Sequence, residues 1–576
     1  MVIIMNGPKK MICGMVCALI ILLPMLSGCD SVIDDAKDII DNLPDSSDID
    51  WTRENPQKLD FNLKDDGTYS VALGSEIYLE KIEIPKTYRG KAVTEIGRFG
   101  HEGSPNLYLE EIIIPDSVTT IGERAFEECG SLISIEMPSS VTSIGNKAFY
   151  KCVNLLKIVI PDSVTRMGYQ AFYDCRNLAS VQISQNLSNI EYDSFYGCIS
   201  LSDIVIPSSV KAIGSGAFSG CTNLKNVTIS DGVTRINGEA FLGCNQLTDI
   251  VVPNSVTSIG KDAFAQCRGI KSISLPFIGM ANGSTNNAQL TYILGSKNKN
   301  SLKTVILTGG GRVGEMAFYG FTALENVVLL DGITEIGYAA FYECSKIQRL
   351  TIPDSVTSIG DAAFAYCDNL TGIVLSEGVT SIGDAAFYRC KSLSDIAIPA
   401  SVTSIGDSAF YSCNSLMSIE IPTGVTNISD NAFDGCYKLV EVINKSSLNI
   451  VAGSEDYGRV AYYAKEVHSG ESKIVKQNDY RFYTYGDVNY LLGYVGNDTE
   501  LVLPESYNGA DYEIYQYTFY NFKINSIVIP ESVTSIGDGA FEGCNVRMIY
   551  CIAASQPDGW DSDWNNYSPV TWGYKG

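Results

Sequence analysis

A repeat of about 23 residues runs through most of this chain and constrains its fold more than any other feature. The pattern Val-Thr-x-Ile-Gly-x-x-Ala-Phe-x-x-Cys recurs with few changes. Because a fixed period of this length produces one coil per repeat, and no coil can bury its apolar side alone, the pattern predicts a solenoid of stacked coils. The repeat phenylalanines are Phe126, Phe149, Phe172, Phe195, Phe218, Phe241, Phe264, Phe318, Phe341, Phe364, Phe387, Phe410, Phe433 and Phe541.

Each repeat is predicted to contain a short strand, a turn and a single helical turn. In the repeat that carries Phe387, residues 370–375 alternate as a strand with one face inward would. Gly383 is expected to supply a backbone conformation that other residues resist. Asp384 follows it and is expected to cap the helical turn.

These units resemble the BspA-type leucine-rich repeats of bacterial surface proteins, over roughly residues 82–444 and 525–545. The resemblance implies a leucine-rich-repeat solenoid, mostly β with short helical turns. It further implies a curved, right-handed superhelix with a parallel sheet on its concave side. It also implies display at the cell surface and binding to host extracellular proteins or to the surface proteins of other bacteria.

The N-terminus is interpreted as an export signal. Lys9 and Lys10 precede an apolar run from Met11 to Met25, which is short for a membrane-spanning helix. The segment ends in Leu26-Ser27-Gly28-Cys29, which looks like a bacterial lipobox with Cys29 as the lipidated residue. An ordinary secretory signal with a chance cysteine is the alternative. The prediction is an exported protein, lipid-anchored to the bacterial membrane and exposed at the cell surface.

Breaks in the repeat suggest a domain organisation. The insertion is expected to be a polar loop extending from one coil, and the three tryptophans near the C-terminus are expected to cover the last coil. The predicted segments are a signal peptide (1–28), a flexible acidic tether (29–55), an N-terminal β-hairpin cap with a degenerate repeat (56–100), the repeat solenoid (101–444, with the insertion at 277–301), a non-repeat β module (445–519), a final repeat (520–545) and a Trp-rich cap (546–576).

Cysteine is unusually frequent for an exported chain, with 17 in total. Thirteen of them follow a repeat phenylalanine by three residues. Disulfides or metal binding would explain such a ladder, but Phe321 replaces the cysteine in one repeat. Because a phenylalanine cannot ligate metal or form a disulfide, the position is predicted to be a buried apolar packing slot with reduced thiols.

Composition and motifs argue against several classes of function. The net charge of −25 opposes generic nucleic-acid binding. With two histidines and no recognised catalytic or metal-binding motif, no enzyme activity, metal or cofactor is expected. Gly309-x-Gly311-x-x-Gly314 matches a dinucleotide fingerprint, but the repeat frame accounts for these glycines, so no nucleotide is expected either.

Two rows of residues are candidate partner-binding surfaces. The first projects from the strands and is rich in β-branched residues, which strand propensity alone also explains. The second follows the repeat phenylalanine, where packing along the rim is the competing explanation. The strand row consists of Val159, Val205, Thr228, Val251, Val328, Thr351 and Val374, and the tyrosine row of Tyr150, Tyr173, Tyr196, Tyr342, Tyr388 and Tyr411.

The leading functional hypothesis is a lipid-anchored surface protein that binds macromolecules through its solenoid, as an adhesin or interaction scaffold. One alternative is a structural cell-envelope protein that binds no soluble partner. Another is a surface protein that binds or processes glycans through residues 546–576.

Overall fold

The computed structural model describes residues 59–73, 79–99, 108–285 and 287–576. They fall into two compact units, Met1–Leu187 and Ser188–Gly576. The predicted signal peptide, the lipobox with Cys29 and the acidic tether lie outside the described residues. Within the described ranges, no helix has the length and apolar character needed to cross a membrane.

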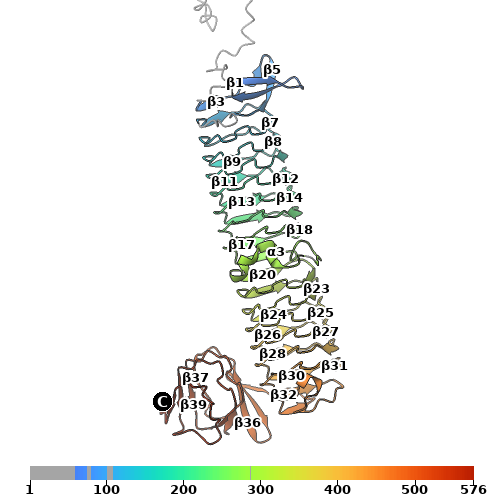
Figure 1. Ribbon diagram of the computed structural model, residues 1–576, viewed down its shortest axis with the longest axis vertical. Helices are drawn as coiled ribbons and strands as arrows, with labels where there is room; N and C mark the ends of the chain where they lie inside the picture. The colour runs from blue at the N-terminus through green and yellow to red at the C-terminus, as the bar shows by residue number, and fades with distance from the viewer. Residues whose placement is uncertain (1–58, 74–78, 100–107, 286) are drawn as a thin grey trace, which may run out of the picture. The chain divides into compact units, whose positions relative to one another are not determined.

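Both units are built from coils of roughly 23 residues that stack through parallel strands, so the predicted repeat solenoid is confirmed. Each regular coil contributes two strands. The first is the predicted strand, and the second is a two-residue strand that ends in the Ile of the repeat. We call the two resulting stacks the first-strand ladder and the second-strand ladder (Figure 1). The curvature and handedness implied by the resemblance stay predictions.

Unit Met1–Leu187 opens on the antiparallel hairpin of β1 (Leu59–Leu63) and β2 (Tyr69–Leu73). A hairpin was predicted to open this repeat block. The short β4 (Thr87–Tyr88) pairs with β5. The second-strand ladder continues from β2 through β5 (Lys91–Ile96), β7 (Thr120–Ile121), β8 (Ser143–Ile144) and β10 (Arg166–Met167), while the first strands are β3 (Lys81–Glu83), β6 (Glu111–Ile113), β9 (Lys157–Val159) and β11 (Ser180–Gln182).

Unit Ser188–Gly576 contains the longer array. Its first strands are β13 (Asp203–Ile206), β15 (Asn226–Ile229), β17 (Asp249–Val251), β19 (Ser272–Leu275), β20 (Thr304–Leu307), β22 (Asn326–Leu329), β24 (Arg349–Thr351), β26 (Gly372–Val374), β28 (Asp395–Ala397), β30 (Ser418–Ile421), β32 (Glu441–Asn444) and β33 (Glu466–His468). Its second strands are β12 (Asn189–Ile190), β14 (Ala212–Ile213), β16 (Arg235–Ile236), β18 (Ser258–Ile259), β21 (Gly311–Val313), β23 (Ile333–Ile336), β25 (Ser358–Ile359), β27 (Ser381–Ile382), β29 (Ser404–Ile405) and β31 (Asn427–Ile428).

The same unit ends in a smaller C-terminal array. A hairpin opens it, formed by β35 (Tyr480–Tyr485) and β36 (Val488–Tyr494), with β34 (Val475–Gln477) on its outer edge. Parallel stacking then resumes in two ladders, β36 with β38 (Tyr512–Ile514) and β40 (Val533–Ile536), and β37 (Glu500–Val502) with β39 (Ser526–Ile529), β41 (Met548–Cys551) and β42 (Val570–Trp572).

The second-strand ladder is a feature that the sequence interpretation missed. Only one parallel sheet was expected, but Ser381 and Ile382 pair in parallel with Ser358 and Ile359 of the preceding coil. In this coil, the buried Ile382 anchors the second strand in the core. The two flat sides of a coil are therefore both hydrogen-bonded to the neighbouring coils.

The predicted helical turn is wrong. We call the segment from the repeat Gly to the repeat Cys the corner, Gly383–Cys390 in this coil. Ala385 and Arg389 have φ of 53° and 57°, which is left-handed and not helical. Their N–H groups, and that of Phe387 between them, donate to carbonyls of the next coil at 2.7–2.8 Å. Bonds to the next coil therefore alternate along the corner with bonds inside the coil, such as that from the N–H of Tyr388 to the carbonyl of Ala385 at 2.9 Å.

The roles assigned to Asp384 and Gly383 change accordingly. The carboxylate of Asp384 caps no helix, because it accepts the backbone N–H of Asp407 in the next coil at 2.8 Å. Gly383 has no positive φ, and it is needed because coils approach closely at this point. A Cβ there would lie 2.7 Å from the backbone nitrogen of Asp361.

The core is a stack of phenylalanines beside a stack of cysteines. Phe387 is fully buried, and its ring centroid lies 5.3 Å from that of Phe364 and 5.2 Å from that of Phe410. The Sγ of Cys390 donates to the carbonyl of Phe364 at 3.1 Å. All 14 cysteines in the described ranges are free and buried, and Phe321 fills its slot at 0% exposure. The predicted apolar slot is confirmed.

The predicted polar loop accounts for only part of the insertion, around the largely exposed residues 282–285. The insertion forms one long coil, because β19 pairs directly with β20. Within it, α3 (Leu290–Leu294) buries its apolar residues, and the 3-10 helix η2 (Ser296–Asn300) follows. The carbonyls of Tyr292 and Ile293 accept the corner N–H groups of Asp262 and Phe264. The helix therefore takes the place of a corner and keeps the stack continuous.

The C-terminal tryptophans pack on the last repeat, where a cap was predicted. Trp560 and Trp564 are 5% and 3% exposed. The indole N–H of Trp560 donates to the carbonyl of Val533 at 3.1 Å, and the ring of Trp564 meets Phe541 edge to face. These two indoles are thereby committed to the core, which weakens the hypothesis that they bind glycans.

Candidate functional site

The predicted strand row lies in the first-strand ladder with its side chains outward. The five valines are the exposed members of greatest apolar area, at 42–64% exposure, and the two threonines are exposed as well. Parallel pairing sets Val205 opposite Thr228, and Thr351 opposite Val374. Since neighbouring strands lie about 4.8 Å apart, the row is regularly spaced within each unit.

The strand row is not a continuous apolar stripe. Val159 is opposite Gln182, and Val251 is opposite Ser274. Val328 of the row does have a large apolar side chain opposite it, Ile306 on the preceding strand. The surface therefore alternates between apolar and hydrogen-bonding positions, as a face that contacts a mixed protein surface would.

The predicted tyrosine row forms stacked pairs. The ring centroids of Tyr150 and Tyr173 are 4.9 Å apart, and those of Tyr388 and Tyr411 are 5.0 Å apart. Tyr342 stacks on Tyr319 at 4.9 Å. This stacking is what the rim-packing explanation predicts, and Tyr196 remains 37% exposed.

One member of the tyrosine row was missed by sequence reasoning. Tyr366 lies two residues after its repeat phenylalanine instead of one, yet its ring lies between Tyr342 and Tyr388, with centroids at 5.2 and 5.5 Å. The guanidinium of Arg389 lies 5.9 Å from the centre of this ring. The adjacent Ala365, too small to fill the slot, was the available signal.

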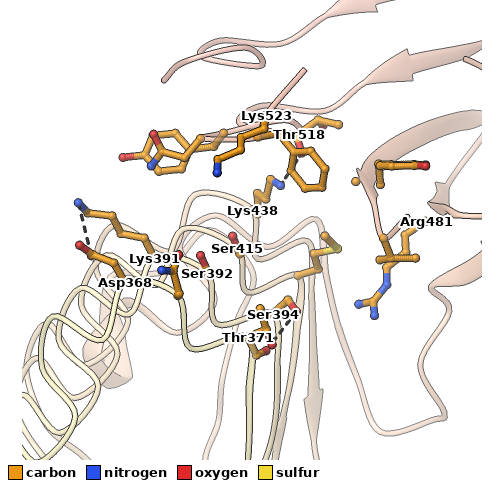
Figure 2. A pocket seen from close by; sticks show the side chains of 18 of the residues that line it. Asp368, Thr371, Lys391, Ser392, Ser394, Ser415, Lys438, Arg481, Thr518 and Lys523 are labelled. Carbon is orange, nitrogen blue, oxygen red and sulfur yellow. Dashed lines mark hydrogen bonds and ion pairs between the residues drawn. The ribbon is translucent and has the colours of Figure 1, made fainter. Parts of the chain in front are cut away.

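A further candidate site is a cleft of about 580 Å³ that the sequence did not predict. We call it the basic cleft. One wall consists of the turns that follow Cys367, Cys390, Cys413 and Cys436, and the other consists of residues 493–496 and 518–523 of the C-terminal array (Figure 2). Its volume is within the range of small-ligand sites.

The two walls are held together by specific contacts. The rings of Tyr437 and Tyr517 stack at 4.8 Å, and the side-chain amide of Gln516 donates to the carbonyl of Tyr437. Tyr515 joins a buried cluster with Met417 of the long array. The cleft is therefore a fixed part of this unit.

Cations dominate the lining of the basic cleft. Arg349, Lys391, Lys438, Arg481 and Lys523 line it, against one carboxylate. That carboxylate, on Asp368, pairs with Lys391 at 3.6 Å. Within the described ranges, Arg349, Arg481 and Lys523 form no ion pair. A chain with a net charge of −25 thus presents a locally positive site.

Lys438 is the unusual residue of the cleft. It is only 4% exposed, and its Nζ donates to the carbonyl of Thr518 at 2.7 Å. Desolvation lowers the pKa of this ammonium to about 7. In Figure 2 it lies between the two walls.

A second polar cluster lies beneath β32 and β33, at the end of the long array. Glu441 is fully buried and accepts bonds from the hydroxyl of Ser472 and the backbone N–H of Lys473. His468 lies 3.2 Å from the same carboxylate, and its Nδ1 accepts the N–H of Gly470. The ring must therefore donate through Nε2. Because Ser472 bonds to Glu441 and not to His468, the cluster lacks the order of a nucleophile and its base.

The remaining motifs and residues give no further site in the described part of the chain. No group of three His, Cys, Asp or Glu side chains there is placed to hold a metal ion. The Gly309–Gly314 segment contains β21 and leads into the corner of its coil, as the repeat frame predicted.

Comparison with known proteins identifies the repeat. The family model described as a BspA type leucine rich repeat region matches with six copies over residues 94–225, 188–306, 296–417, 380–454 and 512–553, which is more than half of the chain. No curated protein matches.

Several solved structures are similar. A leucine-rich repeat protein from Bacteroides ovatus shares 27% identity, covering 68% of this chain and 94% of that one, with a TM-score of 0.40. A leucine rich cell surface protein from Faecalibacterium prausnitzii shares 29% identity, covering 70% and 96%, with a TM-score of 0.33. A pneumococcal vaccine antigen shares 17%, covering 72% and 97%, with a TM-score of 0.31.

Proposed function

We propose that this chain, which belongs to the BspA-type leucine-rich repeat family, is an exported surface protein that binds a macromolecular partner through the strand row. The partner class is a host extracellular protein or a surface protein of another bacterium. The strand row carries the proposal, because it presents exposed valines, alternating with hydrogen-bonding residues, on paired parallel strands. Such side chains gain free energy when a partner removes them from water.

The strand row is tested by charge substitution. The triple variant Val205→Asp, Val251→Asp, Val328→Asp should fold normally, because these side chains are 58%, 64% and 42% exposed. We expect it to lose saturable binding, at least tenfold in affinity, because three carboxylates must be desolvated against the partner. Biolayer interferometry against matrix proteins, mucins and bacterial surface proteins measures the loss.

A matched control lies on the second-strand side. The variant Thr257→Asp, Thr357→Asp, Thr380→Asp adds the same charge at exposed positions beside the second strands. Equal loss in both variants would show a general charge effect and contradict the assignment of the strand row. A folded protein that binds nothing in the panel would favour the structural cell-envelope role instead.

We also propose the lipid anchor on Cys29. The Leu26–Cys29 box and the preceding apolar run support it. The variant Cys29→Ala is expected to move from the membrane fraction to the soluble fraction, because removing the acyl chains removes the anchoring energy. Fractionation followed by immunoblotting measures this, with Cys13→Ala, within the signal itself, as the control. Retention of the Cys29→Ala protein in the membrane would rule the lipobox out.

A further inference from the structure

The basic cleft concentrates positive charge that the fold does not use. Arg481 and Lys523 lie on the C-terminal array and Arg349 lies on the long array, and none of the three has an ion-pair partner among the described residues. Ion pairing elsewhere in the chain is common, with lysines such as Lys303 and Lys473 joined to glutamates at 3.0 and 2.6 Å. Three unneutralised cations around one cavity favour an anionic occupant.

The hydroxyl groups of the cleft are oriented by the stack. Thr371 donates its hydroxyl to the carbonyl of Gln348 at 3.0 Å, and Ser394 donates to the carbonyl of Thr371 at 3.3 Å. Since each hydroxyl has one proton, both oxygens are left to accept bonds from a ligand. Ser392, Ser415 and Asn521 add further polar groups to the lining. The occupant is therefore expected to carry hydroxyl donors as well as negative charge.

The backbone N–H groups of this wall are already hydrogen-bonded to the preceding coil. The N–H of Thr371 donates to Gln348 at 2.8 Å, and that of Ser394 donates to Thr371 at 3.1 Å. An extended peptide gains much of its affinity from main-chain bonds to a free strand edge. Because these groups are used between coils, recognition here depends on side chains, which suits a polyhydroxylated ligand better than an acidic peptide.

We propose that the basic cleft binds an acidic saccharide, with Arg481 and Lys523 pairing its carboxylates and Thr371 and Ser394 accepting its hydroxyl protons. The site is separate from the strand row and does not depend on the function proposed for it. The half-buried rings of Tyr520 and Phe522 on the opposite wall offer apolar surface to the saccharide rings.

The charge state of Lys438 makes the affinity of the cleft depend on pH. Two of its N–H bonds have no partner in the described ranges, and it lies among Arg481, Lys391, Lys523, Asp368 and the thiol of Cys544. A bound carboxylate favours the charged ammonium over the neutral amine. Binding should therefore take up a proton above about pH 7, and affinity should fall as pH rises from 7 to 8.5.

The experiment is calorimetric titration of the full chain in mild detergent. The probes are trigalacturonate, galactotriose as its neutral counterpart, hexaglutamate and inorganic phosphate. We expect trigalacturonate to bind at least tenfold more tightly than the other three. The double variant Arg481→Gln, Lys523→Gln should weaken its binding at least tenfold, and Lys438→Met should flatten the pH dependence.

The repeat itself supplies the control. Lys225 and Lys271 occupy the repeat position of Thr371 and Ser394 in coils that do not line the cleft. Lys225→Gln, Lys271→Gln removes the same charge and should leave trigalacturonate binding unchanged, as should the strand-row triple variant. Equal loss in this control, or equal affinity for galactotriose, would overturn the proposal. Equal binding of hexaglutamate would make the cleft a peptide site, and equal binding of phosphate would make it a general anion site.

Discussion

Raising the pH from 8 to 10 is expected to unfold the repeat array. Burial raises the pKa of twelve cysteine thiols above the ordinary value of 9.0, for example to about 12 for Cys129, Cys221 and Cys436. The folded chain keeps these protons, whereas the unfolded chain releases them above about pH 9. The free energy of unfolding is therefore unaffected below that pH and falls above it, by about 1.4 kcal/mol per pH unit for each thiol.

Summed over these thiols, the loss of unfolding free energy exceeds the gain from any opposing group. Lys438 acts in the other direction, because its lowered pKa makes the folded state more stable as pH rises above about 7. Lys438 contributes one titrating proton, whereas the thiols contribute twelve. The measurement is the urea midpoint between pH 8 and 10, in anaerobic buffer with a reductant, so that the thiols stay reduced.

A matched variant isolates the thiols. Cys390→Ala, Cys413→Ala removes two of the buried protons, so the slope of the unfolding free energy against pH should decrease by about two protons. A midpoint that stays constant from pH 8 to 10 in the parent chain would show that the thiols are not buried and reduced.

Removing one ring from the phenylalanine stack is expected to cost about 3–5 kcal/mol of unfolding free energy. Phe387→Ala leaves a cavity between two rings at 5.3 and 5.2 Å that the fixed coil spacing prevents from closing. Hydrogen exchange should accelerate most in residues 364–410, because each coil is stabilised by its immediate neighbours. Denaturant titration measures the total loss of unfolding free energy.

The adjacent residue provides the control. Tyr388 is half-buried on the tyrosine stack, and Tyr388→Ala should cost only about 0.5–1.5 kcal/mol. Comparable losses for the two variants would contradict the placement of Phe387 at the centre of the core.

The structural features that recur in every repeat are predicted well from the sequence. The coil length, the inward Phe387 and Cys390, and the outward Val205 each follow from a pattern present in every block. The exception at Phe321 even predicted that the cysteine slot is apolar. Repetition multiplies one physical requirement, namely burial of the same face in each coil, until the pattern has no other explanation.

The corner could not be predicted because its bonds run between coils. Within one repeat, Gly383-Asp384-Ala385 resembles a capped helical turn, and only the neighbouring coil shows that Ala385 donates forward to Asp407. Gly383 likewise owes its identity to the backbone of the preceding coil at Asp361, which lies one full repeat away in sequence. Local propensity was overridden by stacking.

The basic cleft was missed for a different reason. It combines residues 349–438 with residues 481–523, and its cations occur once each and not in register. A sequence pattern reveals positions that recur, so a site built from single residues on two arrays leaves no periodic signal.

The left-handed corner also gives the stack a direction, so that its two ends differ. Within unit Ser188–Gly576, corner N–H groups donate to the C-terminal neighbour, as in Phe410, which donates to the carbonyl of Ala432. A severed array would thus show bare amide donors at one end and bare carbonyls at the other. Two copies could extend each other only head to tail, which is the geometry of open-ended fibres. The carbonyl of Gly458 in α4 (Asp456–Arg459) accepts the N–H of Phe433 and closes the long array against that outcome.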